Sequence, residues 1–186
     1  MADLKESPSQ TAGPYVHIGC VPTFAGLTGM YGGADLGAQM IDGDPAGERM
    51  TLTLRVIDGG GEVLKDALIE IWQPGPDGTF GPTPGFNHWG RQPSDGETGE
   101  AVFHTLRPGA PDGQAPHVLV WIAARGINMG LTTRVYLPED TERHGQDPVF
   151  RLAGNRASTL VATAVPDGYR HDILLQGEGE TVFFDV

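Results

Sequence analysis

The chain has 186 residues, enough for one domain with a substantial hydrophobic core. Its formal net charge of −12 argues against binding to nucleic acids or to anionic membrane surfaces. No apolar run approaches the roughly 20 residues of a membrane-spanning helix, and the N-terminus lacks the apolar segment of a signal peptide. The lone Cys20 excludes an internal disulfide and favours a reducing compartment. We therefore expect a single cytoplasmic domain over residues 1–186.

The N-terminal segment, residues 1–14, predicts an extended arm. Its second half shows no periodicity, and each of its prolines favours extended geometry in the residue before it. A frayed terminus is the alternative interpretation. Residues 15–18 then predict a short strand. The glycine-rich stretch 19–48 predicts irregular structure, with one helical turn near residues 34–41.

From Arg49 onward the sequence predicts short strands separated by turns. Residues 50–56 alternate apolar and polar side chains, as a half-buried strand does. A loop of roughly twenty residues, from 79 to 99, is long enough to be functional or interface-forming. With 28 glycines and 15 prolines, the chain predicts an all-β fold, an antiparallel or mixed β-sandwich with long Gly/Pro-rich loops. Further strands are expected at residues 67–73, 100–106, 131–137, 169–176 and 181–185, and a short helix at 139–144.

The stretch from Arg107 to Asn128 predicts a turn, a buried strand and a second turn. Its continuous apolar run over residues 118–124 is typical of a strand that is covered on both faces. His117 begins this strand and Arg125 follows its end. Side chains two apart share a face, so a metal site here would need histidine at position 119 as well. Position 119 is leucine, which offers no ligand atom.

Catalytic motifs of other enzyme classes are missing from the sequence. It contains no G-x-S-x-G, H-E-x-x-H, phosphate-binding glycine loop or C-x-x-C. The acidic residues are scattered in turns, which favours a solvated surface over an acid–base pair. The remaining histidines show no metal-type spacing, so we interpret them as surface or hydrogen-bonded core groups: His17, His88, His104, His144 and His171.

Several long segments, in order along the chain, resemble the intradiol ring-cleaving dioxygenases. Four of them are I-E-I-W-Q at 69–73, D-G-T-F at 77–80, G-E-A-V-F-H-T-L-R-P-G at 99–109 and A-P-H at 115–117. Three more resemble the alpha chain of heteromeric members: S-Q-T-A-G-P-Y-V-H-I-G at 9–19, A-R-G-I-N at 124–128 and Q-G-E-G-E-T-V-F-F-D at 176–185. The resemblance covers the chain from about residue 7 to its end, and its length makes it specific.

The resemblance implies a non-haem Fe(III) that two tyrosines and two histidines of the beta subunit bind. The first tyrosine position falls in residues 79–90, which contain no tyrosine, and the second falls at Ala110 and Pro111. His117 matches the first histidine, whereas Leu119 replaces the second. A single imidazole does not hold Fe(III), which prefers several hard, anionic ligands. We therefore expect no metal on this chain, with His117 as a vestigial ligand position.

The resemblance also implies an activity and partners. The assembled enzyme would be a higher-order alpha–beta oligomer that cleaves protocatechuate with O₂ to 3-carboxy-cis,cis-muconate. The alpha chain would carry no catalytic residue but would line the partner's substrate pocket through Thr11, Gly13, Pro14 and Arg125. A planar guanidinium suits a carboxylate, and glycine and proline let the backbone approach a ligand closely. For Arg125, an ordinary interface ion pair is the alternative.

Two other function classes stay open from the sequence. The chain is then either a non-catalytic β-sandwich binding or assembly module that docks through loop 79–91, or a self-sufficient catechol dioxygenase with other iron ligands. Co-expression with a beta chain separates the first alternative from the alpha-subunit interpretation. Iron content of the isolated chain tests the second.

Overall fold

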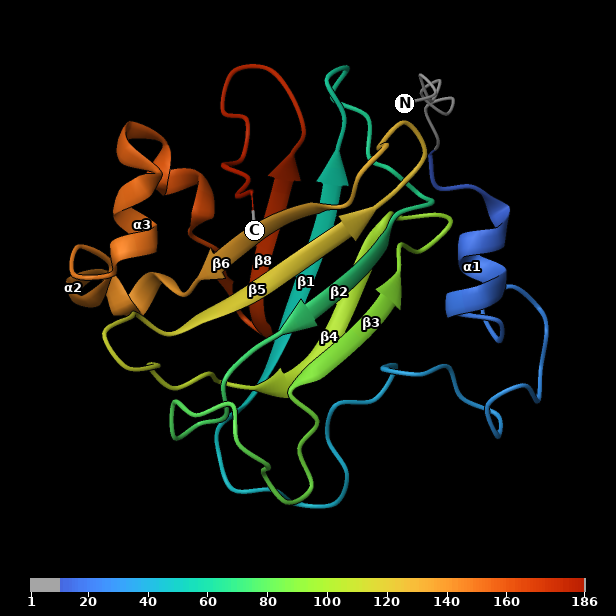
Figure 1. Ribbon diagram of the computed structural model, residues 1–186, viewed down its shortest axis with the longest axis horizontal. Coiled ribbons are helices and arrows are strands. Elements are labelled where there is room, and N and C mark those ends of the chain that lie inside the picture. The colour runs from blue at the N-terminus through green and yellow to red at the C-terminus, as the bar shows by residue number, and fades with distance from the viewer. Residues whose placement is uncertain (1–10, 186) are drawn as a thin grey trace, which may run out of the picture.

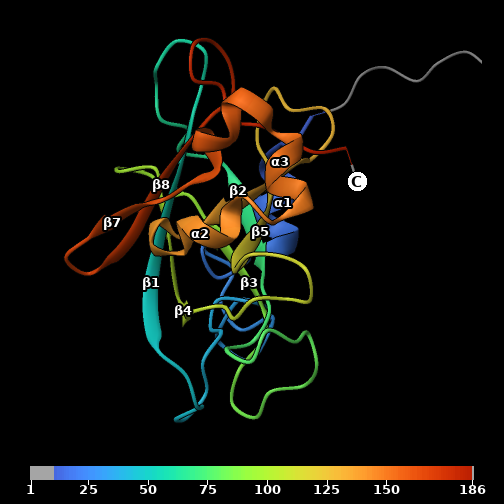
Figure 2. The same ribbon diagram turned by 90° about the vertical axis from the view of Figure 1, so that its left-hand side faces the viewer.

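The computed structural model describes residues 11–185 and shows two four-stranded sheets packed face to face (Figures 1 and 2). One sheet has the order β4-β1-β8-β7 and the other β3-β2-β5-β6. All neighbouring strands are antiparallel except β1 and β8, which are parallel, so the expected mixed β-sandwich is confirmed. The strands are β1 Arg49–Ile57, β2 Leu68–Trp72, β3 Trp89–Pro93, β4 Glu100–Leu106, β5 His117–Ala123, β6 Leu131–Tyr136, β7 Thr163–Val165 and β8 Gly168–Leu174.

The core lies between the two sheets and follows the alternation of the strands. Along β1 every second side chain is buried, as the sequence predicts for a half-buried strand. Each fully buried Leu or Ile contributes roughly 1.5–3 kcal/mol relative to an exposed one. The inward-facing residues of the central strands include Leu52, Leu54 and Val56 on β1, Ile69 and Ile71 on β2, and Val118, Val120 and Ile122 on β5.

Strand β5 departs from the sequence prediction in one respect. Only one of its faces belongs to the core, so the expectation of cover on both faces is wrong. The other face carries His117, Leu119 and Trp121, and it passes from fully buried at His117 to 37% exposed at Trp121. The unbroken apolar run of β5 therefore has one face in the core. Its other face is buried only at the His117 end of the strand.

The loop expected at residues 79–99 is not structureless, because it contains β3. This strand pairs with β2 at the edge of its sheet. Its sequence, W-G-R-Q-P, shows no clear alternation, and proline is tolerated on an edge strand since one side needs no partner. The short β7 was also not predicted. Residues 181–185 form no strand and contribute a single bridge, between Phe184 and Thr132.

The N-terminal region forms a helix where a strand was expected. Residues 15–18 lie in α1, Pro14–Cys20, with Gly13 extended before it. Proline at the first helical position has a preset φ that suits a helix, which explains why the chain turns there. Residues 11–13 have no regular structure, and the rest of the predicted arm lies outside the described residues. Residues 34–41 form turns, not the expected helical turn, and end in a bridge from Ile41 to Phe86.

The remaining helices are short and follow β6. The 3₁₀ turn Pro138–Asp140 and α2, Thr141–His144, confirm the helix expected at 139–144. Helix α3, Pro148–Leu152, and a 3₁₀ segment, Gly154–Leu160, were not predicted. Within residues 11–185, no helix is long and apolar enough to cross a membrane.

Candidate functional site

Thr11 and Arg125, which are more than a hundred residues apart in the sequence, meet at one end of β5. The turn after β5 closes with a hydrogen bond from Ile127 N to Ala124 O of 3.1 Å. Gly126 has φ of +84°, a conformation that favours glycine, so Arg125 lies at the tip of the turn. The Thr11 hydroxyl accepts from Gly126 N at 2.7 Å and donates to Ala124 O at 3.3 Å. Thr11 thus binds the backbone on both sides of Arg125.

The Arg125 side chain extends into solvent from this turn. It is 77% exposed, and its Nε pairs with a carboxylate oxygen of Asp66, which lies two residues before β2. Within residues 11–185 the two terminal nitrogens of the guanidinium make no hydrogen bond of their own. A guanidinium with that edge open can take a carboxylate in a bidentate pair. The exposed ion pair to Asp66 is worth little and does not prevent this.

A cleft of about 910 Å³ lies beside Arg125. The turn after β5, the turn after β1 and the C-terminal segment line it, including Asp58, Met129 and Phe184. Of the four predicted substrate-binding residues only Arg125 lines this cleft. Thr11 contacts the turn that carries Arg125, so the structure brings these two together but not Gly13 or Pro14. The position where a Gly13 side chain would start has nothing within 4 Å, and Pro14 is exposed. Among residues 11–185, nothing therefore covers Pro14 or the side of Gly13 where a side chain would lie.

At the other end of β5, His117 is enclosed. Its exposed fraction is 1%, and its Nδ1 lies 2.8 Å from Ala115 O, to which it donates. The ring packs on Tyr136 with centroids 5.7 Å apart. Burial lowers the pKa of His117 to about 4, and the nearby Arg134 charge acts in the same direction. The imidazole is therefore neutral at physiological pH and part of the packed interior.

A buried polar network extends from Tyr136, beside His117. The Tyr136 hydroxyl lies 3.3 Å from an oxygen of the fully buried Asp147 and 3.3 Å from Arg134 Nη1. Arg134 also donates to Gln114 Oε1 at 2.7 Å. Asp147 accepts from Ala115 N at 3.0 Å and caps α3 through the backbone N–H groups of two residues, at 2.8 and 3.2 Å. Three segments of the chain, the turn before β5, β6 and the start of α3, are thus joined around one carboxylate.

The side chains around His117 do not fit ferric iron. Leu119, the next residue on the same face, offers no ligand atom. Burial raises the pKa of Tyr136 to about 12, so its hydroxyl remains a phenol, whereas an iron ligand would be phenolate. The permanent cation of Arg134 within reach of that hydroxyl disfavours a second cation. Among residues 11–185, no three or more His, Cys, Asp or Glu side chains are placed to hold a metal ion.

The Arg134–Asp147 network was not predicted from the sequence. Asp147 before Pro148 carries the one available signal, because aspartate followed by proline is typical of a helix start. Nothing in the sequence pattern of Arg134 or Gln114 indicates that they meet Asp147. Their meeting depends on the packing of β6 against the α2–α3 region.

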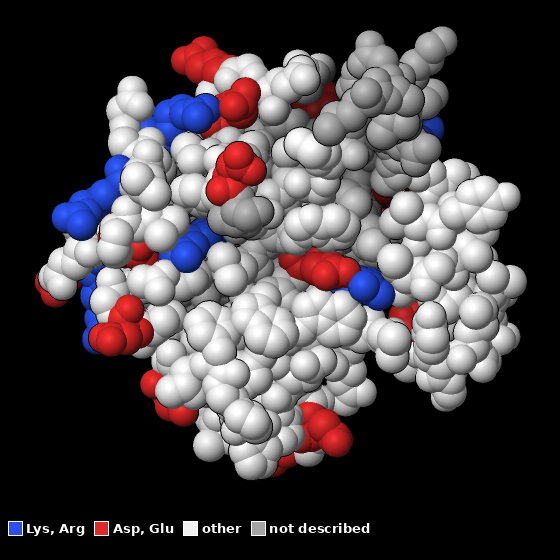
Figure 3. Space-filling model, in the orientation of Figure 1, with Lys and Arg blue, Asp and Glu red and all other residues white. Residues whose placement is uncertain are grey.

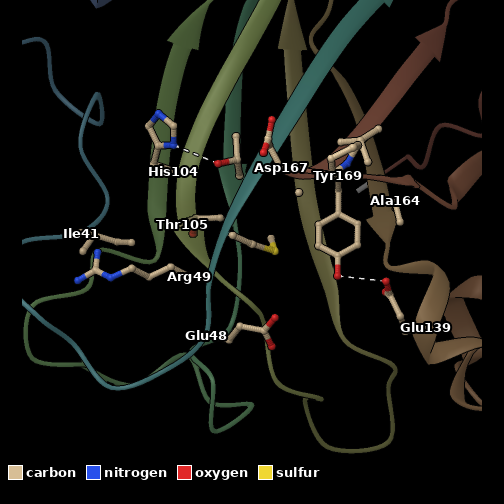
Figure 4. Close-up of a pocket in the computed structure, with 14 residues that line it drawn as sticks. Ile41, Glu48, Arg49, His104, Thr105, Glu139, Ala164, Asp167 and Tyr169 are labelled. Carbon is tan, nitrogen blue, oxygen red and sulfur yellow. Dashed lines mark hydrogen bonds between the residues drawn. The ribbon is translucent and has the colours of Figure 1, made fainter.

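A second pocket, of about 660 Å³, lies on the other sheet (Figure 4). Its main polar side chains bind one another: the Tyr169 hydroxyl lies 3.2 Å from Glu139 Oε1 and accepts from Arg107 Nη1 at 2.8 Å. His104 Nδ1 lies 3.3 Å from the Thr51 hydroxyl. These groups lie apart on opposite sides of the pocket in Figure 4 and do not converge on one point. We therefore assign no site to it.

Comparison with known proteins identifies the family. A family model described as "Dioxygenase" matches residues 22–177. The alpha chain of protocatechuate 3,4-dioxygenase from Pseudomonas putida is 38% identical, over 98% of this chain and 97% of that one. The beta chain of the Burkholderia cepacia enzyme is 31% identical, over 82% of this chain and 78% of that one. An intradiol ring-cleavage dioxygenase from Tetranychus urticae shares the fold, with a TM-score of 0.60 at 19% identity over 73% of this chain and 84% of that one. The chain therefore belongs to the intradiol dioxygenase family, as the motifs in its sequence predict.

Proposed function

We propose that this chain is the alpha subunit of a heteromeric protocatechuate 3,4-dioxygenase and binds no iron itself. The observation that carries the proposal is its similarity to such an alpha chain over nearly the full length of both proteins. The donor set around His117 supports it, because that set does not fit ferric iron. The iron and the oxygen chemistry would then belong to a homologous beta subunit in the cytoplasm, in a higher-order alpha–beta oligomer.

In this proposal the chain contributes substrate binding and pocket closure. The open edge of the Arg125 guanidinium binds the carboxylate of protocatechuate, or its developing negative charge, at the mouth of the partner's pocket. Thr11 holds the N-terminal segment on the turn that carries Arg125. Pro14 is exposed, and Gly13 has no described atom within 4 Å of the place where a side chain would start, so both are accessible to the partner. The reaction converts protocatechuate and O₂ into 3-carboxy-cis,cis-muconate.

The outer face of the β3-β2-β5-β6 sheet supports an interface with a partner. Trp72 and Phe80 are each 42% exposed and stack with centroids 6.2 Å apart, and Trp121 is 37% exposed. Figure 3, which views the molecule from this side, shows a largely uncharged surface around one acidic group and one basic group that lie side by side near its centre. Exposed aromatic side chains gathered on one face are typical of protein–protein interfaces. A large apolar interface with the beta chain would cover them.

Co-expression tests the proposal. The chain is purified alone and together with an iron-bearing beta chain of the same family, and iron content and ring opening of protocatechuate are measured for both preparations. We expect iron and activity only in the complex. An isolated chain that binds iron stoichiometrically and opens the ring would refute the proposal.

The non-catalytic module is distinguished in the same complex. Phe80 lies in the loop proposed for docking and Trp72 lies beside it, and both are exposed. Exposed aromatic side chains are expected in an alpha subunit and in a non-catalytic module alike, so they do not separate the two. If the chain only assembles or docks, changes at Thr11 and Arg125 should leave ring cleavage untouched while the complex still forms. In the proposed alpha subunit those changes alter the kinetics for protocatechuate.

A further inference from the structure

Glu70 and Arg91 form a rigid pair on the outer face of the β3-β2-β5-β6 sheet. The two residues lie directly opposite each other in the register of β2 and β3. Arg91 Nε donates to one oxygen of Glu70 at 2.8 Å, and Nη2 lies 2.6 Å from the same oxygen in the ion pair. Trp89 Nε1 donates to the other oxygen at 3.1 Å. The guanidinium also lies 4.9 Å from the centroid of the Trp89 ring. These contacts hold the Arg91 side chain in one geometry.

The third nitrogen of the Arg91 guanidinium, Nη1, reaches helix α1. This nitrogen donates to the carbonyl oxygen of Cys20, the last residue of that helix, at 3.2 Å. The last carbonyls of a helix have no partner inside the helix, and a cation there is favourable. Figure 1 shows α1 standing beside the sheet at the β3 edge, where Arg91 lies. Arg91 therefore connects the sheet to the C-terminal end of α1.

Helix α1 has little else to set its direction. It has seven residues, all described, and none of them is buried. A helix this short is marginal without tertiary contacts. Val21, the next residue, is fully buried and fixes one point of the chain. Thr11 binds the turn after β5 three residues before α1 begins. Residues 11–34 contain no Lys, Arg, Asp or Glu of their own, so among the described residues Arg91 is the charged side chain that holds the end of α1.

The same arginine also holds the chain that returns from α1. Arg91 N donates to Gly37 O at 2.8 Å, so side chain and backbone of one residue bind both ends of the segment 21–36. Gly37 packs directly on the Trp89 ring, where a side chain would start 2.7 Å from a ring atom. Segment 21–36 and the C-terminal end of α1 are thus attached to the sheet at Glu70, Trp89 and Arg91, whereas Thr11 attaches the chain before α1 to the turn after β5.

We propose that Arg91, held by Glu70 and Trp89, is a positioning residue for the substrate pocket: it fixes the C-terminal end of α1 and, together with Thr11 before the helix, the place where Gly13 and Pro14 meet the partner. This inference rests on the proposed function, because the pocket in question belongs to the beta subunit. Arg91 contacts neither substrate nor iron in this arrangement. It acts through α1, at whose start Gly13 and Pro14 lie.

The test uses the assembled alpha–beta enzyme with three variants of this chain. Arg91→Met removes the donors, and Arg91→Lys keeps the charge but not the planar fork. Arg55→Met is the matched control, since it breaks a comparable half-buried pair, with Asp172, that joins β1 and β8 in the other sheet. Hydrogen exchange of the α1 amides, unfolding temperature, kcat and KM for protocatechuate are measured for each.

We expect Arg91→Met to speed exchange of the α1 amides at least tenfold and to raise KM at least threefold, with Arg91→Lys between it and the unaltered enzyme. Arg55→Met should change neither, even where it lowers the unfolding temperature as much. Unchanged exchange in α1 for Arg91→Met would overturn the inference. So would faster exchange with unchanged kinetics, provided that Arg125→Ala in the same assay does alter KM.

The two proposals fail in different ways. If neither Arg91→Met nor Arg125→Ala changes the kinetics, this chain does not line the pocket, so the pocket-lining part of the proposed function fails and the positioning role with it. If Arg125→Ala is impaired and Arg91→Met is not, only the positioning role is lost.

Discussion

The two ends of β5 show opposite ways of using a polar side chain. His117 and Arg125 are separated by one strand, roughly 25 Å at about 3.3 Å per residue. At the His117 end, Tyr136, Arg134 and Asp147 bind one another inside the chain. At the Arg125 end, the guanidinium is 77% exposed and pairs only through Nε within the described residues.

This difference indicates which interactions the chain completes alone and which it leaves for a partner. A buried polar group without a partner costs free energy, so the closed network at His117 is a requirement of folding. An exposed cation costs little, so Arg125 need not be satisfied until a ligand arrives. The comparison predicts that changes at the first end act on stability and changes at the second act on function.

The largest effect is expected from Asp147→Ala. Its carboxylate is fully buried and accepts hydrogen bonds from Ala115 N and from the start of α3, and its loss leaves Arg134 uncompensated. We expect the free energy of unfolding to fall by about 3–5 kcal/mol. Urea unfolding measures this. Asp44→Ala, at a 97% exposed side chain, is the control and should change it by less than about 0.5 kcal/mol. If Asp147→Ala lowered the free energy of unfolding by less than about 0.5 kcal/mol, the network around Asp147 would not be required for stability.

The pH dependence of stability tests the buried histidines. Burial lowers the pKa of both His117 and His171 to about 4. In the unfolded chain the pKa is near 6.5, so the unfolded state takes up protons first as the pH falls. Stability is therefore full above about pH 6.5 and is lost between there and pH 4, by up to about 3 kcal/mol for each group.

Urea unfolding at several pH values between 7.5 and 5 measures this slope. His171→Gln should flatten it, whatever the variant does to stability at pH 7.5. His104→Gln, at an exposed position on β4, should leave it unchanged. An equal slope for His171→Gln and the unaltered protein would show that His171 does not stay neutral in the folded state.

Arg125→Ala should act on function and leave stability almost unchanged. In the assembled enzyme we expect KM for the carboxylated catechol to rise, or turnover to fall, by at least about tenfold, which corresponds to ~1.4 kcal/mol. The unfolding free energy should change by less than about 1 kcal/mol, because the pair with Asp66 is exposed. Steady-state kinetics and urea unfolding measure both, with Arg156→Ala, in a partly exposed pair with Glu180, as control. Unchanged kinetics would remove Arg125 from the pocket.

The smallest effect is expected from Thr11→Val, which keeps the shape and removes the hydroxyl. Gly126 N then loses its acceptor, a loss worth roughly 0.5–1.5 kcal/mol at this partly exposed place. We expect a two- to fivefold rise in KM in the assembled enzyme, smaller than for Arg125→Ala. Thr11→Ser keeps the hydroxyl and should behave like the unaltered chain. A rise in KM for Thr11→Ser with none for Thr11→Val would assign the contribution of Thr11 to its methyl group instead.

Prediction of the fold from the sequence succeeded where side-chain alternation encodes burial. Strand β1 is the example, because every second residue faces the core. It failed at β3 and α1, whose conformations depend on a neighbouring strand and on Pro14. For the candidate site, the residues alone placed Arg125 at the end of a strand. The role of Thr11 came only from the family resemblance, since nothing local links it to a turn 113 residues away.

The residue types alone decided that three of the four iron ligands implied by the family resemblance are missing. Residues 79–90 contain no tyrosine, and the leucine, alanine and proline side chains at the other positions carry no ligand atom wherever they lie. The net charge and the period of the strands were equally independent of tertiary packing. Only the tertiary structure decided that His117 is neutral, that Asp147 joins Arg134 and Tyr136, and that Thr11 lies across the Arg125 turn. Burial and hydrogen-bond partners are contributed by distant segments, so they exist only once those segments have packed together.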